Sequence, residues 1–178
     1  QEYFNKAQIV DKEGQARPLV AKEEKIVVTG KTPADFVSRG ITPMQSASLL
    51  LILVAGISIY GIRRGKTLWG IDLILFLVAG MAGCILAFLA LFSQHPAVSP
   101  NYILFVFHPF HLFCLPFMLS RVRKREISRY MLVDFAVLTL FIGLWTIIPQ
   151  RIPPAVLPLA LCLLIRSASN LILTYKRK

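Results

Sequence analysis

The sequence contains few of the residues from which catalytic and metal sites are usually built. Its 178 residues include only three histidines and three cysteines. The cysteines, Cys84, Cys114 and Cys162, form no CxxC pair, and each lies within an apolar run, which argues against a disulfide framework and a cysteine metal site. A glycine-rich phosphate loop, an HExxH helix and a GxSxG elbow are also absent. We therefore expect no complete active site, no bound metal and no cofactor.

Acidic residues are scarce, with nine against twenty basic residues and a net charge of +11. A nucleic-acid partner would require basic residues spread over a surface that follows phosphates. Here they gather at the ends of apolar runs, as in the loops that set the topology of membrane proteins. We therefore expect no nucleic-acid partner and a phospholipid bilayer instead. The clusters are Arg63, Arg64 and Lys66; Arg121, Arg123, Lys124, Arg125 and Arg129; and Lys176, Arg177 and Lys178.

Apolar residues make up 56% of the chain, too many for a soluble surface to hide. From Met44 onward the apolar runs approach the roughly 20 residues that cross a bilayer as a helix. The first begins at a capping box, with Thr42 as N-cap and Gln45 three residues later. These runs predict an all-α membrane protein with five transmembrane helices. The predicted spans are about 43–62, 68–92, 100–120, 130–148 and 153–174.

The basic residues also predict an orientation. They lie in the loops after the first, third and fifth spans, whereas the loop at 93–101 has none and the loop at 149–154 has one. Because basic loops stay in the cytoplasm, we expect a cytoplasmic C-terminus and an N-terminus on the outer side.

Residues 1–40 differ from the rest in carrying a nearly neutral mixture of charges. Short apolar segments beside the turn-like DKEG and GK predict a β-hairpin, and TPADFVSRG predicts a short interfacial helix at 33–39. Forty residues cannot bury a useful core alone. Since the chain opens with Gln and shows no signal pattern, we expect 1–40 to end an extracytoplasmic domain and 41–178 to form the transmembrane domain.

Charged residues inside the predicted spans are costly to bury and usually mark partners or pathways. Arg166 lies near mid-bilayer and needs an anionic partner, and Asp72 and Asp134 lie just inside the cytoplasmic ends of two spans. A structural ion pair is the favoured interpretation. The alternative is that Arg166 binds the phosphate of a lipid drawn between the helices.

The three histidines, His95, His108 and His111, fall within the stretch SQHPAVSPNYILFVFHPFHLF. Pro109 and Pro116 predict a kink in the third span, with His108 satisfying backbone groups freed by the break. A metal site is disfavoured because both carboxylates of the spans are placed at the opposite side of the membrane. We therefore interpret His95, Asn101, His108 and His111 as a candidate surface for lipid headgroups or for docking an exported domain.

The sequence AGMAGC at 79–84 concentrates small residues in the second span. Small residues let helix backbones approach closely, so Ala79, Gly80 and Gly83 predict a helix-packing face. A groove that admits an acyl chain is the other interpretation.

Several of these segments together resemble a known family. They are RRGK at 63–66, Asp72, LFLVAGMAGC, FSQHPAVSPNYILF, HPFHLF and IIPQRIPP. This combination resembles the five-helix membrane domain of the Lnb-type proteins of Bacteroidetes, which are lipoprotein N-acyltransferase-like. The resemblance implies an inner-membrane location and an upstream periplasmic domain that carries cysteine and histidine chemistry. It also implies transfer of an acyl chain from a phospholipid to the N-terminal amine of a lipoprotein.

The cysteines of this chain match no catalytic position of that family, so we expect the chain alone to be non-catalytic. Its predicted function is to anchor an upstream catalytic domain at the membrane and to present lipid to it. The expected partners are the bilayer, that upstream domain and a lipoprotein substrate. One alternative is a small transporter or channel subunit with a polar pathway at Arg166, Asp72 and Asp134. Another is a membrane enzyme centred on the histidines.

Overall fold

The chain divides into two units, residues 1–40 and 41–178, in a computed structural model that describes residues 8–10, 15–18, 40–93 and 100–176. In the first unit, strands β1 (Gln8–Val10) and β2 (Ala16–Pro18) pair antiparallel, with Ile9 opposite Arg17. The predicted interfacial helix at 33–39 lies outside the described residues, as does His95.

The second unit begins with α2 (Pro43–Arg64). The predicted capping box is confirmed: the Thr42 side chain accepts from the backbone N–H of Gln45, and the Gln45 side chain accepts from the backbone N–H of Thr42. The helix ends at Gly65, which adopts a left-handed conformation with φ 62° that favours glycine. The two ends of α2 are therefore set by the Thr42 capping box and by the left-handed Gly65.

Helices α3 (Trp69–Phe92) and α7 (Val156–Tyr175) are also long and apolar. Within the described residues, α2, α3 and α7 could each cross a membrane by length and composition, and a bent helix pair would make a fourth crossing if it counts as one span. The prediction of a membrane protein built from apolar helices is thus confirmed.

The segment expected to be one kinked span at 100–120 is broken into three helices. These are a 3₁₀ helix, η2 (Tyr102–Phe105), then α4 (Phe110–Phe113) and α5 (Leu115–Lys124). The axis bends by 78° where α5 begins. Both prolines sit at helix starts, with Pro109 as N-cap of α4 and Pro116 in the first turn of α5, where a missing N–H costs nothing.

The fourth predicted span, 130–148, is also shorter in the structure. Helix α6 covers Arg129–Gly143, and the chain continues as turns to Ile147. Pro149 follows soon after, and the residue before a proline disfavours helical geometry.

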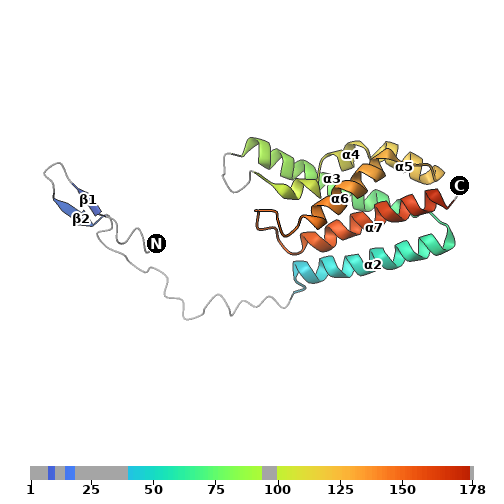
Figure 1. The fold of residues 1–178 in the computed structure, drawn as a ribbon, viewed down its shortest axis with the longest axis horizontal. Coiled ribbons are helices and arrows are strands. Elements are labelled where there is room, and N and C mark those ends of the chain that lie inside the picture. Colours follow the sequence, from blue (N-terminus) through green and yellow to red (C-terminus); the bar gives the residue numbers. More distant parts are fainter. Residues whose placement is uncertain (1–7, 11–14, 19–39, 94–99, 177–178) are drawn as a thin grey trace. The chain divides into compact units, whose positions relative to one another are not determined.

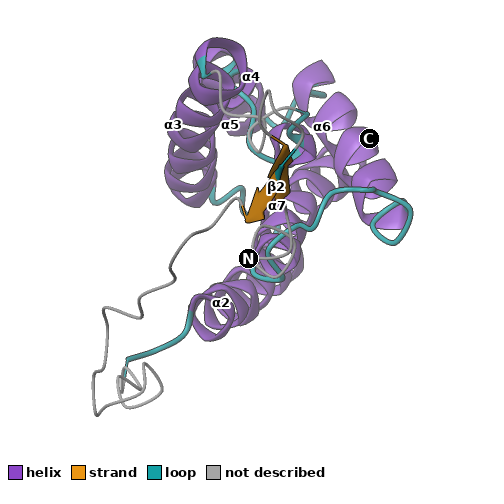
Figure 2. Ribbon diagram, turned by 90° about the vertical axis from the view of Figure 1, so that its left-hand side faces the viewer, coloured by secondary structure: helices purple, strands orange, loops and turns teal. Residues whose placement is uncertain are grey.

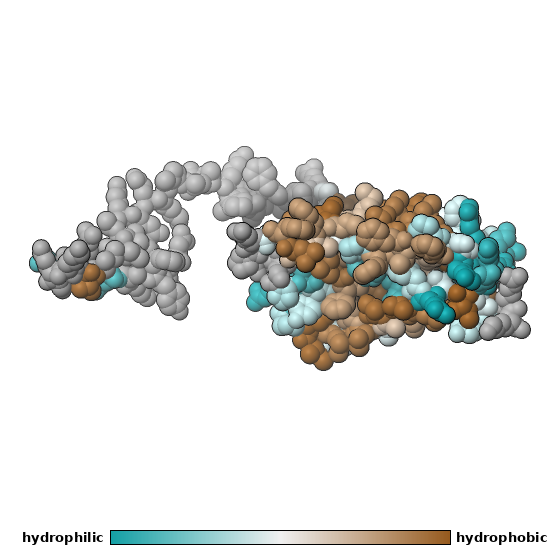
Figure 3. Space-filling view, turned by 90° about the horizontal axis from the view of Figure 1, so that it is seen from above, coloured by the Kyte–Doolittle hydropathy of each residue, from teal (hydrophilic) through white to brown (hydrophobic). Residues whose placement is uncertain are grey.

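Helix α7 lies at the centre of the helical unit. It packs along α2 on one side and α6 on the other, whereas α3 packs against α4 and α5 (Figures 1 and 2). The buried core joins these two groups through Phe76 of α3, Leu138 of α6 and Ala160 of α7. Apolar side chains cover much of the exterior along the helices, while hydrophilic ones gather at one end (Figure 3).

Two glycines determine how closely the broken segment approaches α3. A Cβ on Gly80 would lie 2.6 Å from the backbone nitrogen of Leu112, and a Cβ on Gly83 would lie 2.5 Å from the carbonyl carbon of His108. Atoms cannot approach that closely, so only glycine permits this contact. The glycines of AGMAGC therefore allow the backbone of residues 108–112 to pack directly against α3.

We predict that Gly83→Ala destabilises the protein by about 1–3 kcal/mol, because backbone must move to admit the methyl group. Gly56→Ala is the matched control, since a Cβ on this exposed α2 residue meets nothing within 4 Å. Denaturant unfolding in detergent would measure both variants, and equal stabilities would contradict the packing argument.

Candidate functional site

A buried ion pair joins α7 to α3. The Arg166 guanidinium donates from Nε to Asp72 Oδ1 at 2.7 Å and from Nη2 to Asp72 Oδ2 at 3.1 Å. The two residues are 1% and 0% exposed. Two parallel bonds between a planar guanidinium and a carboxylate form the strongest arrangement available to such a pair.

Two neutral groups extend this ion pair. Arg166 Nη1 donates to Ser58 Oγ of α2 at 3.0 Å, and Asn170 Nδ2 donates to Asp72 Oδ2 at 3.0 Å. Asn170 lies four residues after Arg166, on the same face of α7. The ion pair therefore joins α2, α3 and α7. The described hydrogen bonds of Arg166 all go to protein side chains.

Asp134 is not a partner of Arg166. Instead it accepts a hydrogen bond at Oδ2 from Ser167 Oγ, at 2.6 Å, between α6 and α7. It is 2% exposed. Asp72 of α3 is therefore the carboxylate that binds Arg166, and Asp134 of α6 is not.

His111 lies beside Asp134. Its Nε2 donates to the Val106 carbonyl at 2.8 Å, since a carbonyl can only accept, and its Nδ1 then accepts from Tyr130 Oη at 2.5 Å. Val106 precedes Pro109 in the broken segment, so a histidine does satisfy the backbone there, but it is His111 and not His108. Phe76 of α3 packs edge-on against the His111 ring, with 5.2 Å between centroids.

His108 and His111 are therefore not separated from both carboxylates, contrary to the expectation from the sequence. His111 Nδ1 is 3.9 Å from Asp134 Oδ1, and the His108 ring stacks on the His111 ring with centroids 3.9 Å apart. Ligand atoms of His108, His111 and Asp134 all lie within 4.8 Å of one another. The expected separation was wrong because the third segment bends by 78° at the start of α5 and does not continue as one helix.

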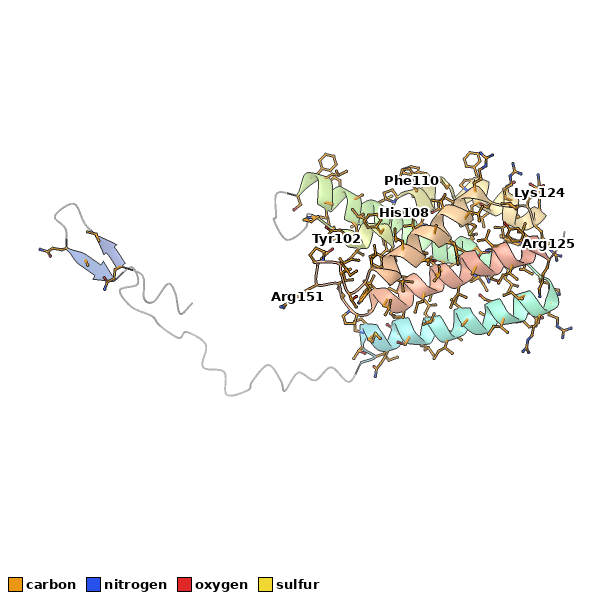
Figure 4. All side chains as sticks on the ribbon, in the orientation of Figure 1. Tyr102, His108, Phe110, Lys124, Arg125 and Arg151 are labelled. Atoms are coloured by element: carbon orange, nitrogen blue, oxygen red, sulfur yellow. The ribbon has the colours of Figure 1, made fainter. Side chains whose placement is uncertain are left out.

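Only part of the candidate surface for lipid headgroups or domain docking, predicted at His95, Asn101, His108 and His111, can be reached from outside the protein. His111 is 0% exposed, so it cannot belong to such a surface, and His108 is half-buried. Asn101 instead caps η2 by accepting from the Ile103 N–H at 3.1 Å, and the neighbouring Tyr102 N–H donates to Gln150 Oε1 at 2.7 Å. Figure 4 shows Tyr102 and Arg151 at one end of the helical unit, and Lys124 and Arg125 at the other.

Sequence reasoning missed Ser58, Tyr130, Ser167 and Asn170. The signal for the last two was the run RSASN at 166–170, which places polar residues in succession inside an apolar helix. Polar side chains at that depth usually bond across to neighbouring helices. All three cysteines are free thiols, and only Cys162 is fully buried.

We predict that Arg166→Met destabilises the protein by about 3–5 kcal/mol, because it leaves the Asp72 carboxylate buried without a cation. Adding Asp72→Leu should recover most of this loss, since apolar replacement of both partners is often neutral. Arg121→Ala is the control: the exposed Arg121–Glu126 pair should contribute only about 0–1 kcal/mol. Unfolding measurements on the four proteins would test this, and a double variant no more stable than Arg166→Met would contradict it.

Comparison with known proteins identifies the helical unit. A family model described as the Lnb transmembrane domain matches residues 35–178. Comparisons with curated proteins and with solved structures give no significant match. The matched range contains α2 to α7. It therefore includes the Arg166–Asp72 ion pair and the cluster of His108, His111 and Asp134, called the histidine cluster below. The chain therefore belongs to the Lnb transmembrane domain family.

Proposed function

We propose that this chain is the membrane anchor of an Lnb-type lipoprotein N-acyltransferase-like protein, and that it holds an upstream catalytic domain at the outer face of the bacterial inner membrane. The observation that carries the proposal is the family match over residues 35–178. The structure supports it physically: Arg166 and Asp72 neutralise each other inside, while apolar side chains face outward. A bundle of this kind is stable in lipid.

In this proposal the chain crosses the membrane five times, with the N-terminus outside and the C-terminus in the cytoplasm. Helix α6 and the broken segment then count as crossings. Two contacts support this arrangement. Arg125 Nη2 donates to the Gly65 carbonyl, which joins two basic loops at one end, and Tyr102 bonds to Gln150 at the other. Arg123 also lies over the Trp69 ring, 3.8 Å from its centroid, beside the first of these contacts.

We predict that a cysteine introduced at Arg151 reacts with a membrane-impermeant maleimide added to intact spheroplasts, whereas one introduced at Lys66 reacts only after permeabilisation. The basic loop that contains Lys66 stays in the cytoplasm because translocating its charges is unfavourable. A background with Cys84, Cys114 and Cys162 replaced by alanine is the control for native thiols. Equal labelling of both positions would contradict the topology.

A groove supports the presentation of lipid. It has a volume of about 620 Å³ and is lined by apolar side chains of α2, α3, α7 and the broken segment at 102–124, including Leu50, Val78, Ala82, Phe107 and Leu163. Along α3 the lining runs from Ile74 to Leu86, which is about 18 Å at 1.5 Å per residue. A carbon-lined groove of this length suits one acyl chain and offers nothing to water.

The chemistry itself belongs upstream in this proposal. A thiolate of the exported domain attacks an ester carbonyl of a phospholipid, forms a thioester and releases the lysophospholipid. The lipoprotein amine then attacks the thioester, forms an amide and, after losing a proton, releases the thiolate. Both substrates are lipids, so fixing the catalytic domain at the membrane raises their effective concentration. The three cysteines of this chain lie on apolar helices or between them and have no part in that transfer.

The transporter alternative requires Arg166, Asp72 and Asp134 to face a hydrated passage. Arg166 and Asp72 are almost fully buried and donate or accept within the protein, and Asp134 is held by Ser167. The geometry therefore favours an anchor over a polar pathway.

We predict that Ala82→Trp in the full-length protein lowers lipoprotein N-acylation at least about tenfold, because the indole fills a groove that binds an acyl chain by apolar burial. Ile52→Trp is the matched control, since Ile52 is 68% exposed on α2 and does not line the groove. Mass spectrometry of the lipoprotein N-terminus would measure acylation at equal protein levels.

A second experiment separates anchoring from presentation. The helical unit is replaced by an unrelated single transmembrane helix in the full-length protein. Full activity of this chimera would exclude lipid presentation and leave anchoring intact. Full activity of the upstream domain without any membrane attachment would exclude anchoring as well.

A further inference from the structure

Of the four buried side-chain atoms without a hydrogen-bond partner in the described helical unit, Ser169 Oγ and Asn170 Oδ1 among them, two belong to one small cluster. They are His108 Nδ1 and Asp134 Oδ1. His108, His111 and Asp134 each offer one ligand atom within 4.8 Å of those of the other two, and His111 Nδ1 lies 3.9 Å from Asp134 Oδ1. Buried polar groups in proteins are almost always paired, so two unpaired atoms in one cluster call for an explanation.

The tautomer of His111 is fixed by its surroundings. Because the Val106 carbonyl can only accept, His111 Nε2 carries the proton, and the one lone pair of Nδ1 accepts from the Tyr130 hydroxyl at 2.5 Å. A backbone carbonyl on one ring nitrogen is the usual way in which proteins orient a histidine that binds a metal through the other. His111 is therefore oriented with Nδ1 toward the cluster, and a metal bound there replaces the hydrogen bond from Tyr130.

Asp134 is oriented in the same way. Ser167 donates to Oδ2 and leaves Oδ1 directed at the histidines, 3.9 Å from His111 Nδ1. In contrast to Asp72, which has Arg166, the described neighbours of this carboxylate include no arginine or lysine bound to it. An ionised carboxylate in that position requires a cation.

From this geometry we propose that His108, His111 and Asp134 bind one transition-metal dication through two imidazole nitrogens and a carboxylate oxygen. Tyr130 Oη, 2.5 Å from His111 Nδ1, lies beside the fourth position. Two histidines and a carboxylate suit Zn²⁺ or Fe²⁺ and do not suit Ca²⁺ or Mg²⁺, which prefer oxygen ligands. This inference does not depend on the proposed anchoring role.

Binding requires a small local rearrangement. Tetrahedral ligands at zinc distances lie roughly 3.4 Å apart, so the cluster contracts and the His108 ring leaves its stacked position on His111. Nothing in the described structure holds His108 Nδ1, and its side chain is only partly buried. His108 is therefore the ligand that is free to turn, while His111 and Asp134 are fixed.

The test uses the protein purified in detergent, first analysed for bound zinc and iron and then stripped with a chelator. Zn²⁺ is titrated against a chromophoric competitor, and Co²⁺ is added as a spectroscopic probe. We expect one Zn²⁺ per chain, visible Co²⁺ bands typical of a tetrahedral site, and a rise in melting temperature on adding Zn²⁺. The variants are His108→Phe and Asp134→Asn, and His95→Ala is the control for nonspecific imidazole binding.

A ligand substitution should weaken Zn²⁺ binding by roughly 100-fold or more, since losing even an outer-shell partner costs 10–100-fold. His108→Phe keeps an aromatic ring on His111 and breaks no described hydrogen bond, so a purely structural cluster predicts unchanged or improved stability for it. Loss of the Zn²⁺-dependent rise in melting temperature in a folded His108→Phe protein supports the site. Absence of stoichiometric Zn²⁺ or Fe²⁺ binding by the wild type, or equal Zn²⁺ affinity of His108→Phe and the wild type, would overturn it.

Discussion

The buried pair between Arg166 and Asp72 is the constraint on which the arrangement of the helices depends. A guanidinium buried among membrane-spanning helices is costly without a carboxylate, and a carboxylate buried there is costly without a cation. Nε and Nη2 of Arg166 bond to both oxygens of Asp72, and Nη1 bonds to Ser58. Any arrangement that separated α7 from α3 or α2 would break these bonds in a medium that offers no replacement. The central position of α7 follows from this.

Helix α7 binds its neighbours through successive residues. Arg166 and Ser167 are adjacent, so their side chains leave the helix about 100° apart. One direction reaches Asp72 on α3, and the other reaches Asp134 on α6. Asn170 repeats the first direction one turn later. In lipid, where apolar packing gives little preference between helices, such polar contacts decide which helices are neighbours.

Much of the helical architecture follows from the sequence. Hydropathy predicts α2, α3 and α7, the capping box predicts where α2 begins, and AGMAGC predicts where another segment approaches α3 closely. The predicted position of Arg166 near the middle of the bilayer is enough to indicate that it needs a carboxylate. It does not select Asp72 over Asp134, because the two lie at similar positions in their helices and only the three-dimensional packing decides between them.

The histidine cluster could not be predicted, because its formation depends on the direction of a break. A proline shows that regular geometry ends, but not which way the chain then turns. Here the 78° bend brings His111 to Asp134, whereas a single helix through 100–120 separates them. The C-terminal end of α6 was misjudged for a related reason: hydropathy continues past Gly143 to Ile148, but the backbone leaves helical geometry before the hydropathy falls.

The two carboxylates, similar in sequence position, have opposite surroundings. Asp72 has a permanently charged guanidinium and an amide, so its environment is complete and resists change. Asp134 has a serine hydroxyl, with a histidine and a tyrosine close by, and one of its oxygens has no hydrogen bond. All of these neighbours can rearrange protons or accept a ligand, which Arg166 cannot do. The fixed pair therefore holds α2, α3 and α7 together, whereas Asp134, at the junction of α6 with the broken segment, keeps one oxygen without a hydrogen bond.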